Sequence, residues 1–244
     1  MRAAETGASE PYPSTPYSST LGPLSRRILD LIRERGLRSG DPMPTEVELI
    51  DVLAVSRNSV REALRSLRTL GIIEVRHGYG TVVGEPSLHV LSPSLVFRTV
   101  TTTSGVLDEL RNLVEIRELI ETGVVERLAG TVPESTLDAL DELCDTMARS
   151  PLDPETDRAF HRRLYAEVDN PLVGQLIDVF WDAYHAGGAA LDAPKGSETA
   201  QTLRRHRAIV AALRSGDGTA ARSAMTDHFA EIKRRLDAAC SAAP

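Results

Sequence analysis

Three histidines and one aspartate have the types and spacing of a metal site. Asp157 and His161 are four residues apart in a stretch with helical periodicity, so both side chains lie on one face. His206 and His228 fall on the apolar faces of two later stretches. A lone inward histidine is commonly a core residue bonded to a neighbour, but three such histidines with a carboxylate are unfavourable to bury without partners. A divalent cation would satisfy all four, and this set of donors suits Zn, Ni or Mn.

A second group with chemical potential is a row of arginines within residues 55–70. At helical periodicity the arginines share one face and aliphatic residues share the other. The charged face carries Arg57, Arg61, Arg65 and Arg68, and the apolar face carries Val60, Ala63, Leu64, Leu67 and Leu70. Ser56 can cap this helix and Gly71 can end it. Alone, such a face could be a solvated surface, so its neighbours decide the interpretation.

Those neighbours predict a winged helix-turn-helix. Thr45 and Glu48 have the spacing of a capping box for a short preceding helix. Residues 54–56 then have the length of the turn in a helix-turn-helix, whose second helix enters the DNA major groove. Two β-branched runs, 71–76 and 80–83, flank a glycine-rich tip and predict a hairpin.

This part of the chain, about Leu24 to Val83, resembles the GntR family of bacterial transcription regulators. The resemblance rests on GLRSGDPMPTEVEL, VSRNSVREAL and GIIEVRHGYGTVV. It implies DNA contacts from the start of the arginine helix and a hairpin tip in the minor groove. The residues expected to make them are Arg57, Asn58, Ser59, Arg61 and Arg65, with His77 and Gly78 at the tip. Val47 stands where many relatives have an operator-contacting arginine, so we expect no contact there.

The rest of the chain is predicted to be helical, which makes the fold mainly α. Prolines and glycines separate six expected helices of an antiparallel bundle, at 106–129, 134–150, 155–168, 171–191, 198–215 and 218–239. The expected organisation is a disordered tail (1–20), a winged helix-turn-helix (21–84), a linker that could contain a short apolar helix (85–105), and an all-helical ligand-binding and dimerisation domain (106–240).

The bundle is similar to the FCD ligand-binding domain of the FadR-like branch of the GntR family, over roughly Leu107 to Leu236. The matching residues are Asp157, Phe160, His161, Asn170, His206 and His228. In that domain the aspartate and the histidines bind a metal. Six helices rather than seven suggest the VanR-type subgroup and hence no acyl-CoA ligand. Arg205 departs from the pattern, because an acidic residue is common before the histidine.

The segment EIRELIE resembles the first-helix signature of that domain, in which the arginine binds an anionic ligand. Arg117 is therefore the candidate for a bidentate bond to an effector carboxylate. The alternative is a salt bridge from Arg117 to Glu121, one helical turn later. Other candidates for the pocket are Tyr165, Trp181, Tyr184 and His185, of which His185 is a weaker candidate for an extra metal ligand.

Whole-chain properties narrow the function further. The 244 residues carry a net charge of −7, but residues 56–80 contain five arginines and only two glutamates, which favours DNA contact at that one place. A hydrophobic share of 41% with 4% aromatic residues predicts an aliphatic core. Cys144 and Cys240 lack a disulfide framework, and no apolar run approaches the ~18 residues of a membrane span. These features favour the cytoplasm.

The sequence thus predicts a homodimeric DNA-binding transcriptional regulator that is not an enzyme. It would act as a repressor on an inverted-repeat operator, under control of a small organic acid bound at the metal. Two alternatives are a regulator whose metal is itself the signal or is structural, and a metal-dependent hydrolase fused to a DNA-binding module. The hydrolase lacks an obvious general base beside the four ligands.

Overall fold

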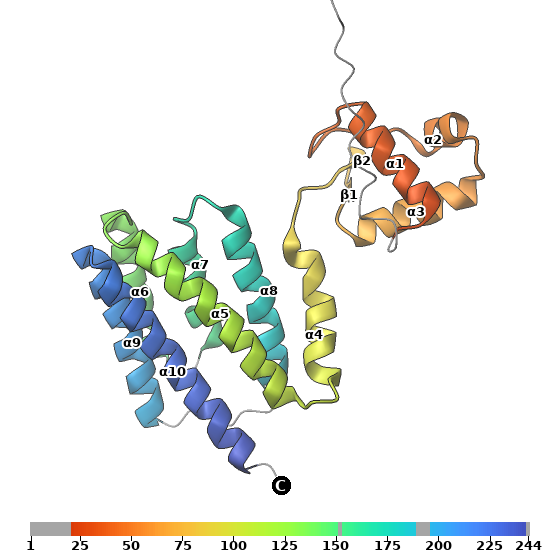
Figure 1. Ribbon diagram of the computed structural model, residues 1–244. Coiled ribbons are helices and arrows are strands. Elements are labelled where there is room, and N and C mark those ends of the chain that lie inside the picture. The colour runs from red at the N-terminus through yellow and green to blue at the C-terminus, as the bar shows by residue number, and fades with distance from the viewer. Residues whose placement is uncertain (1–20, 151–152, 189–195, 243–244) are drawn as a thin grey trace, which may run out of the picture. The chain divides into compact units, whose positions relative to one another are not determined.

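The computed structural model describes residues 21–150, 153–188 and 196–242. Contacts divide the chain into two units, residues 1–87 and 88–244, whose α-helices and strands are labelled in Figure 1. The tail predicted at residues 1–20 lies outside the described residues.

The first unit is a helix-turn-helix followed by a hairpin, as predicted. Its elements are α1 (Pro23–Glu34), α2 (Glu46–Leu53), α3 (Arg57–Thr69), β1 (Ile73–Arg76) and β2 (Gly80–Val83). Thr45 and Glu48 form the complete capping box of α2, and Ser56 accepts a hydrogen bond from the Ser59 amide at the start of α3. The local sequence therefore fixes where both helices begin.

The hairpin is held by its pairing and by two glycines at its tip. The strands pair antiparallel, with Ile73 opposite Val83 and Arg76 opposite Gly80. Gly78 and Gly80 have φ angles of 79° and 84°, a region that other residues rarely adopt. The apolar faces of the helices and β1 enclose an aliphatic core that includes Ile28, Leu49, Val60, Leu67 and Ile73.

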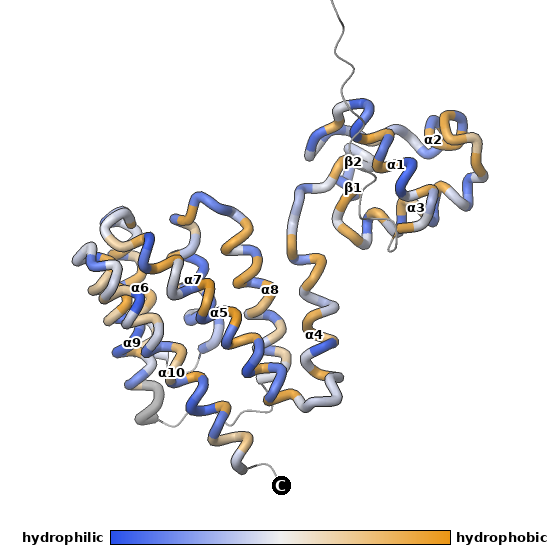
Figure 2. The backbone as a smooth tube through the Cα atoms, in the orientation of Figure 1, coloured by the Kyte–Doolittle hydropathy of each residue, from blue (hydrophilic) through white to orange (hydrophobic). Residues whose placement is uncertain are grey.

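The second unit is a helical bundle. Its elements are the short 3-10 helix η2 (Leu88–Leu91), α4 (Ser92–Thr101), α5 (Val106–Leu128), α6 (Glu134–Arg149), α7 (Pro154–Tyr165), α8 (Pro171–Gly187), α9 (Gly196–Ser215) and α10 (Gly218–Ala242). α10 packs along α5 and α9, α6 along α7 and α9, and α8 along α5 and α4. Polar and apolar residues alternate along these helices (Figure 2), so that each can bury one face.

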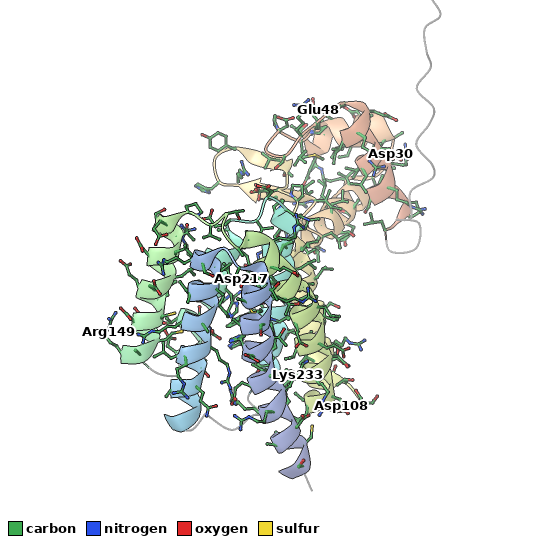
Figure 3. All side chains as sticks on the ribbon, turned by 60° about the vertical axis from the view of Figure 1, so that its left-hand side comes forward. Asp30, Glu48, Asp108, Arg149, Asp217 and Lys233 are labelled. Atoms are coloured by element: carbon green, nitrogen blue, oxygen red, sulfur yellow. The ribbon has the colours of Figure 1, made fainter. Side chains whose placement is uncertain are left out.

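Capping groups mark several of the helix ends that proline and glycine predicted. Asn170 accepts a hydrogen bond from the Leu172 amide at 3.1 Å and caps α8. Asp217, labelled in Figure 3, lies in the turn between α9 and α10, and its Oδ1 accepts a hydrogen bond from the Ala220 amide at 2.9 Å. These local bonds explain why the predicted and observed helices begin at nearly the same residues.

The stretch expected as a linker, residues 85–105, is mostly helical. The six helices expected after residue 105 are present, and α4 adds a seventh α-helix to the described part of the second unit. Leu95 and Val96 of α4 pack against the bundle core, Ser92 Oγ donates to Asp182 Oδ2 at 2.7 Å, and the Leu88 amide donates to Gln175 Oε1 at 2.9 Å. The bundle therefore includes α4, and helix number gives no support for the VanR-type subgroup.

Candidate functional site

All the residues predicted to contact DNA are exposed on the first unit. The helix presents Arg57, Asn58, Ser59, Arg61 and Arg65, and the hairpin tip presents His77 and Gly78. A groove of 470 Å³ between α3 and the hairpin is lined by Arg61, Arg65 and Arg68 on one side and by Val75 and Thr81 on the other. The arginine face and the hairpin thus border one concave surface.

Acidic neighbours accompany the arginines of this groove. Arg61 Nε lies 3.5 Å from Glu46 Oε1, and Arg65 Nη1 donates to Glu62 Oε1 at 2.7 Å. The side chains of Arg61 and Arg65 are 62% and 65% exposed. Exposed ion pairs contribute only ~0–1 kcal/mol, so both guanidinium groups remain available to phosphate or base edges.

The hairpin also exposes an aromatic side chain that the sequence reasoning did not select. Tyr79 is 83% exposed at the tip, between Gly78 and Gly80. The position of Tyr79 between two glycines, at the tip of the predicted hairpin, was the sequence signal that could have identified it as exposed. Val47 of α2 is 57% exposed, and its side chain has no polar atom with which to contact DNA.

In the second unit the three predicted histidines come together. His161 of α7, His206 of α9 and His228 of α10 each offer a ring nitrogen, and these atoms lie within 4.8 Å of one another. All three side chains are buried. Asp157 lies beside them, with Oδ1 2.8 Å from His206 Nε2 and 3.7 Å from His161 Nε2. The four residues that the sequence proposed as ligands therefore converge.

Hydrogen bonds and charge orient this cluster. His206 Nδ1 donates to the Thr202 carbonyl at 2.9 Å, so Nε2 faces Asp157. Burial opposes ionisation of Asp157, but the hydrogen bond from His206 and the nearby imidazoles lower its pKa. Burial likewise opposes the charge on His206, whose pKa is nevertheless raised by Asp157. Burial, reinforced by the other two histidines, lowers the pKa of His228.

The environment of His161 fits a bound cation. Its side chain is 1% exposed, and neither ring nitrogen has a hydrogen-bond partner in the part of the chain that the structure describes. Leaving a buried polar atom unpaired costs about 1–3 kcal/mol. A divalent ion held by three imidazole nitrogens and one carboxylate oxygen would satisfy Nε2 and is a donor set that first-row metals accept.

Arg117, the predicted anion-binding residue, is buried on α5. Its Nε donates to Glu121 Oε1 at 2.8 Å, so the alternative salt bridge is present. Nη2 of the same guanidinium is buried and has no hydrogen-bond partner among the described residues. Burial opposes the charge on Arg117, but Glu121 more than compensates and raises its pKa. Arg117 therefore stays charged and keeps one buried donor unused.

Glu121 connects Arg117 to the histidine cluster. Its Oε2 accepts the Tyr165 hydroxyl at 2.5 Å and lies 3.2 Å from His161 Nδ1, in a direction that does not meet hydrogen-bond geometry. Burial alone would raise the pKa of Glu121, but the Arg117 charge and these contacts hold it at about 2. The sequence reasoning considered Glu121 only as a partner of Arg117, because nothing in the spacing signals a contact with His161.

A cavity of 340 Å³ lies between α7 and α8 beside this cluster. His161, Tyr165 and Trp181 form part of its wall, as do Arg158, Arg162 and Asp178. Arg158 Nη2 and Arg162 Nε lie 3.3 Å and 2.6 Å from Asp178 Oδ1, so both arginines are paired with this aspartate. The volume is within the lower range of small-ligand pockets.

Three other residues singled out in the sequence lie outside the histidine cluster. His185 stacks on Trp181 with ring centroids 4.5 Å apart, and its Nδ1 lies 3.0 Å from the Trp181 carbonyl oxygen. It lies outside the group of three histidines, so the structure gives it no role as a ligand. Tyr184 is partly buried against the bundle core. Arg205 Nη2 lies 3.2 Å from Glu231 Oε2 of α10, which supplies the acidic partner at that position.

Comparison with known proteins identifies both units. Residues 24–83 match the family described as "Bacterial regulatory proteins, gntR family", and residues 112–231 match the "FCD domain". The HTH-type transcriptional regulator YcbG of Bacillus subtilis (strain 168) is 32% identical over 213 residues, which cover 86% of this chain and 87% of YcbG.

The chain belongs to the GntR family.

Another relative, the "Galactonate operon transcriptional repressor" of Escherichia coli (strain K12), is 27% identical over 81% of this chain and 88% of its own length. The solved structure titled "Streptococcus agalactiae GntR" superimposes with a TM-score of 0.62 at 30% identity, covering 86% of this chain and 97% of that one. The chain is therefore a DNA-binding transcriptional regulator with an FCD domain, and not an enzyme. None of the described helices has both the length and the apolar character needed to cross a bilayer.

Proposed function

We propose that this GntR-family regulator is a homodimeric repressor whose affinity for an inverted-repeat operator is controlled by a small organic acid bound at a metal in the helical domain. The observation that carries the proposal is the convergence of Asp157, His161, His206 and His228 beside a buried arginine with an unused donor. The exposed arginine groove of the first unit would bind the operator.

Asp157 and the three histidines would hold a divalent ion, with Zn, Ni and Mn as the candidates. Such an ion supplies a fixed positive charge and open positions for oxygen ligands. The Thr202 carbonyl holds the Nδ1 proton of His206, which leaves Nε2 free to face the ion. The Phe160 ring packs edge-on against the His206 ring, with the two ring centroids 4.7 Å apart, and restrains the rotation of the imidazole.

Charge balance supports an anionic effector. The buried charges of Arg117 and Glu121 cancel each other. Asp157 offsets half of a divalent cation, so one positive charge remains, and a monocarboxylate would neutralise it. Arg117 Nη2 would donate to that carboxylate, and the 340 Å³ cavity beside His161 offers room for a small molecule. A relative named for the galactonate operon makes a hydroxylated acid the first class to test.

Exposed apolar residues on α5 support the dimer. Ile116 and Leu119 are 42% and 71% exposed and lie one turn apart. Gly123 follows on the same face, and a Cβ at that glycine would meet nothing within 4 Å. A second copy of α5 could pack closely against this strip and remove it from water. Two copies of α3 would then be presented to the two halves of an inverted repeat.

Control of DNA binding would follow from a shift between two arrangements of the dimer. An effector that binds one arrangement better moves the population toward it and changes the spacing of the two α3 helices. Because proteins of this family bind DNA, the proposed location of the protein is the cytoplasm. Repression relieved by the acid is the direction supported by the repressor named among the relatives.

The test uses the full-length dimer and DNA selected from a random library. Elemental analysis of the purified protein should find about one divalent ion per chain, and small hydroxy acids should raise the melting temperature only when the ion is present. An acid that does so should weaken the gel shift, and Arg117→Gln should abolish both effects. Metal that alone changes DNA binding, with no response to any acid, would instead identify a metal-responsive regulator.

A further inference from the structure

Glu121 occupies a position between the two halves of the proposed effector site. It is fully buried in the middle of α5. Its Oε1 accepts from Arg117 Nε at 2.8 Å, whereas its Oε2 accepts from the Tyr165 hydroxyl and faces His161 Nδ1 at 3.2 Å. One carboxylate therefore contacts both the anion-binding arginine and a histidine of the metal cluster.

The orientation of the His161 ring assigns different tasks to its two nitrogens. Nε2 lies 3.7 Å from Asp157 Oδ1, within the cluster, and Nδ1 faces Glu121. A histidine that binds a metal through one nitrogen carries its proton on the other, and a carboxylate that accepts this proton fixes the ring and makes the ligand nitrogen more basic. A small rotation of the ring would align Nδ1–H with Glu121 Oε2.

His206 and His161 are held in different ways. The His206 Nδ1 proton goes to the backbone carbonyl of Thr202 within its own helix, whereas the group that faces His161 Nδ1 is a side chain on another helix. That side chain also holds Arg117. A single carboxylate therefore lies between Arg117 and His161.

We propose that Glu121 is a positioning residue that sets the tautomer of His161 and thereby couples metal affinity to the state of Arg117. The inference rests on the metal and effector site proposed above. An effector that draws Arg117 toward itself leaves more of the Glu121 charge for His161, so acid and metal strengthen each other's binding reciprocally.

The first experiment measures the dissociation constant of Zn²⁺ on the full-length protein, by competition with a chromophoric chelator. Glu121→Gln should weaken Zn²⁺ binding about 10- to 100-fold. Arg117→Gln should bind Zn²⁺ as well as the wild type or more tightly, because Glu121 then serves His161 alone. Glu118→Gln is the matched control, since Glu118 is on the same helix and pairs with Lys233 away from the cluster.

A double variant, Arg117→Gln with Glu121→Gln, keeps the buried charges balanced and covers the case in which the single Glu121 variant fails to fold. It should bind Zn²⁺ as weakly as Glu121→Gln is expected to. Zn²⁺ binding within threefold of the wild type, in either folded Glu121 variant, would overturn the inference. Absence of Zn²⁺ binding in the wild type would overturn the metal site itself, which is a separate failure.

Nitrogen-15 NMR of the histidines provides a readout that a purely structural role would not move. In chelator-treated wild-type protein at pH 8, we expect His161 to carry its proton on Nδ1. In the double variant, the proton should be distributed over both nitrogens. A His161 ring protonated on Nε2 in the wild type would contradict the assignment, whatever the metal affinities are.

Discussion

Replacing Arg61 by alanine tests the central functional claim, that the exposed face of α3 binds DNA. The Arg61 side chain is 62% exposed and lines the groove between α3 and the hairpin. Its neighbour is Glu46, 3.5 Å away and itself exposed, so the change removes an ion pair that contributes no more than ~1 kcal/mol. We therefore expect the folded state to be almost unaffected.

The expected effect on DNA binding is much larger. An arginine that contacts a base contributes about 1–3 kcal/mol, and the proposed dimer would lose two such contacts, or roughly 2–6 kcal/mol. This cost is a net difference for the substitution, so it already includes the Glu46 pairing that each chain gives up on binding, and it corresponds to roughly 30-fold to 20,000-fold in the dissociation constant. If Arg61 contacts phosphate instead, the slope of log affinity against log salt should fall by about 0.9 per contact.

The assay is a fluorescence-anisotropy titration of labelled operator DNA at several salt concentrations. Arg33→Ala is the control, because it removes the same charge from α1, where Arg33 pairs with Asp30 outside the groove. Equal affinities and equal salt slopes for the Arg61 and Arg33 variants would refute the assignment of α3 as the DNA-reading helix.

Three further predictions follow from single residues. His206→Ala should weaken metal binding by more than about 100-fold without unfolding the bundle, and elemental analysis that finds full occupancy would contradict the ligand assignment. Burial raises the pKa of the Cys144 thiol to about 12. At pH 8, iodoacetamide should therefore label it roughly a thousandfold more slowly than an ordinary thiol. Rapid labelling of the native protein would show instead that α6 opens. Gly84→Ala places a Cβ 2.1 Å from the Gly71 carbonyl oxygen and should destabilise the winged unit by ~1–3 kcal/mol. Gly22→Ala is the control, because its Cβ meets nothing within 4 Å. Equal denaturation midpoints for the two variants would show that the chain relaxes around the new Cβ at position 84 at no cost in stability.

The features that the sequence predicted correctly depend on residues close together in the chain or on the apolar face of a single helix. The capping box of Thr45 and Glu48 and the cap at Ser56 are made within three residues, so the start of each helix can be read directly. The convergence of His161, His206 and His228 could be predicted because each lies on the apolar face of its own helix, and all apolar faces meet in one core.

The features that the sequence did not reveal depend on contacts between distant segments. α4 was expected to lie in a linker because threonines and a glycine follow it, but Leu95 and Val96 find a partner surface on the bundle that no local pattern announces. In the same way, the contact of Glu121 with His161 requires knowing how α5 and α7 face each other. The residue type of His185 made it a weaker candidate for an extra ligand, whereas its ring stacks on Trp181.

The pairing of groove arginines with carboxylates has a consequence for how such a protein searches a genome. Arg61 and Arg65 of the groove each have a glutamate beside them, as does Arg76 of β1 outside it. A phosphate must displace that glutamate before it gains the full attraction of the guanidinium group. A brief encounter with arbitrary DNA therefore gains little binding free energy. Each pair costs at most ~1 kcal/mol to break, so the cost matters for an encounter that makes one or two contacts and is outweighed at a site where many contacts form at once.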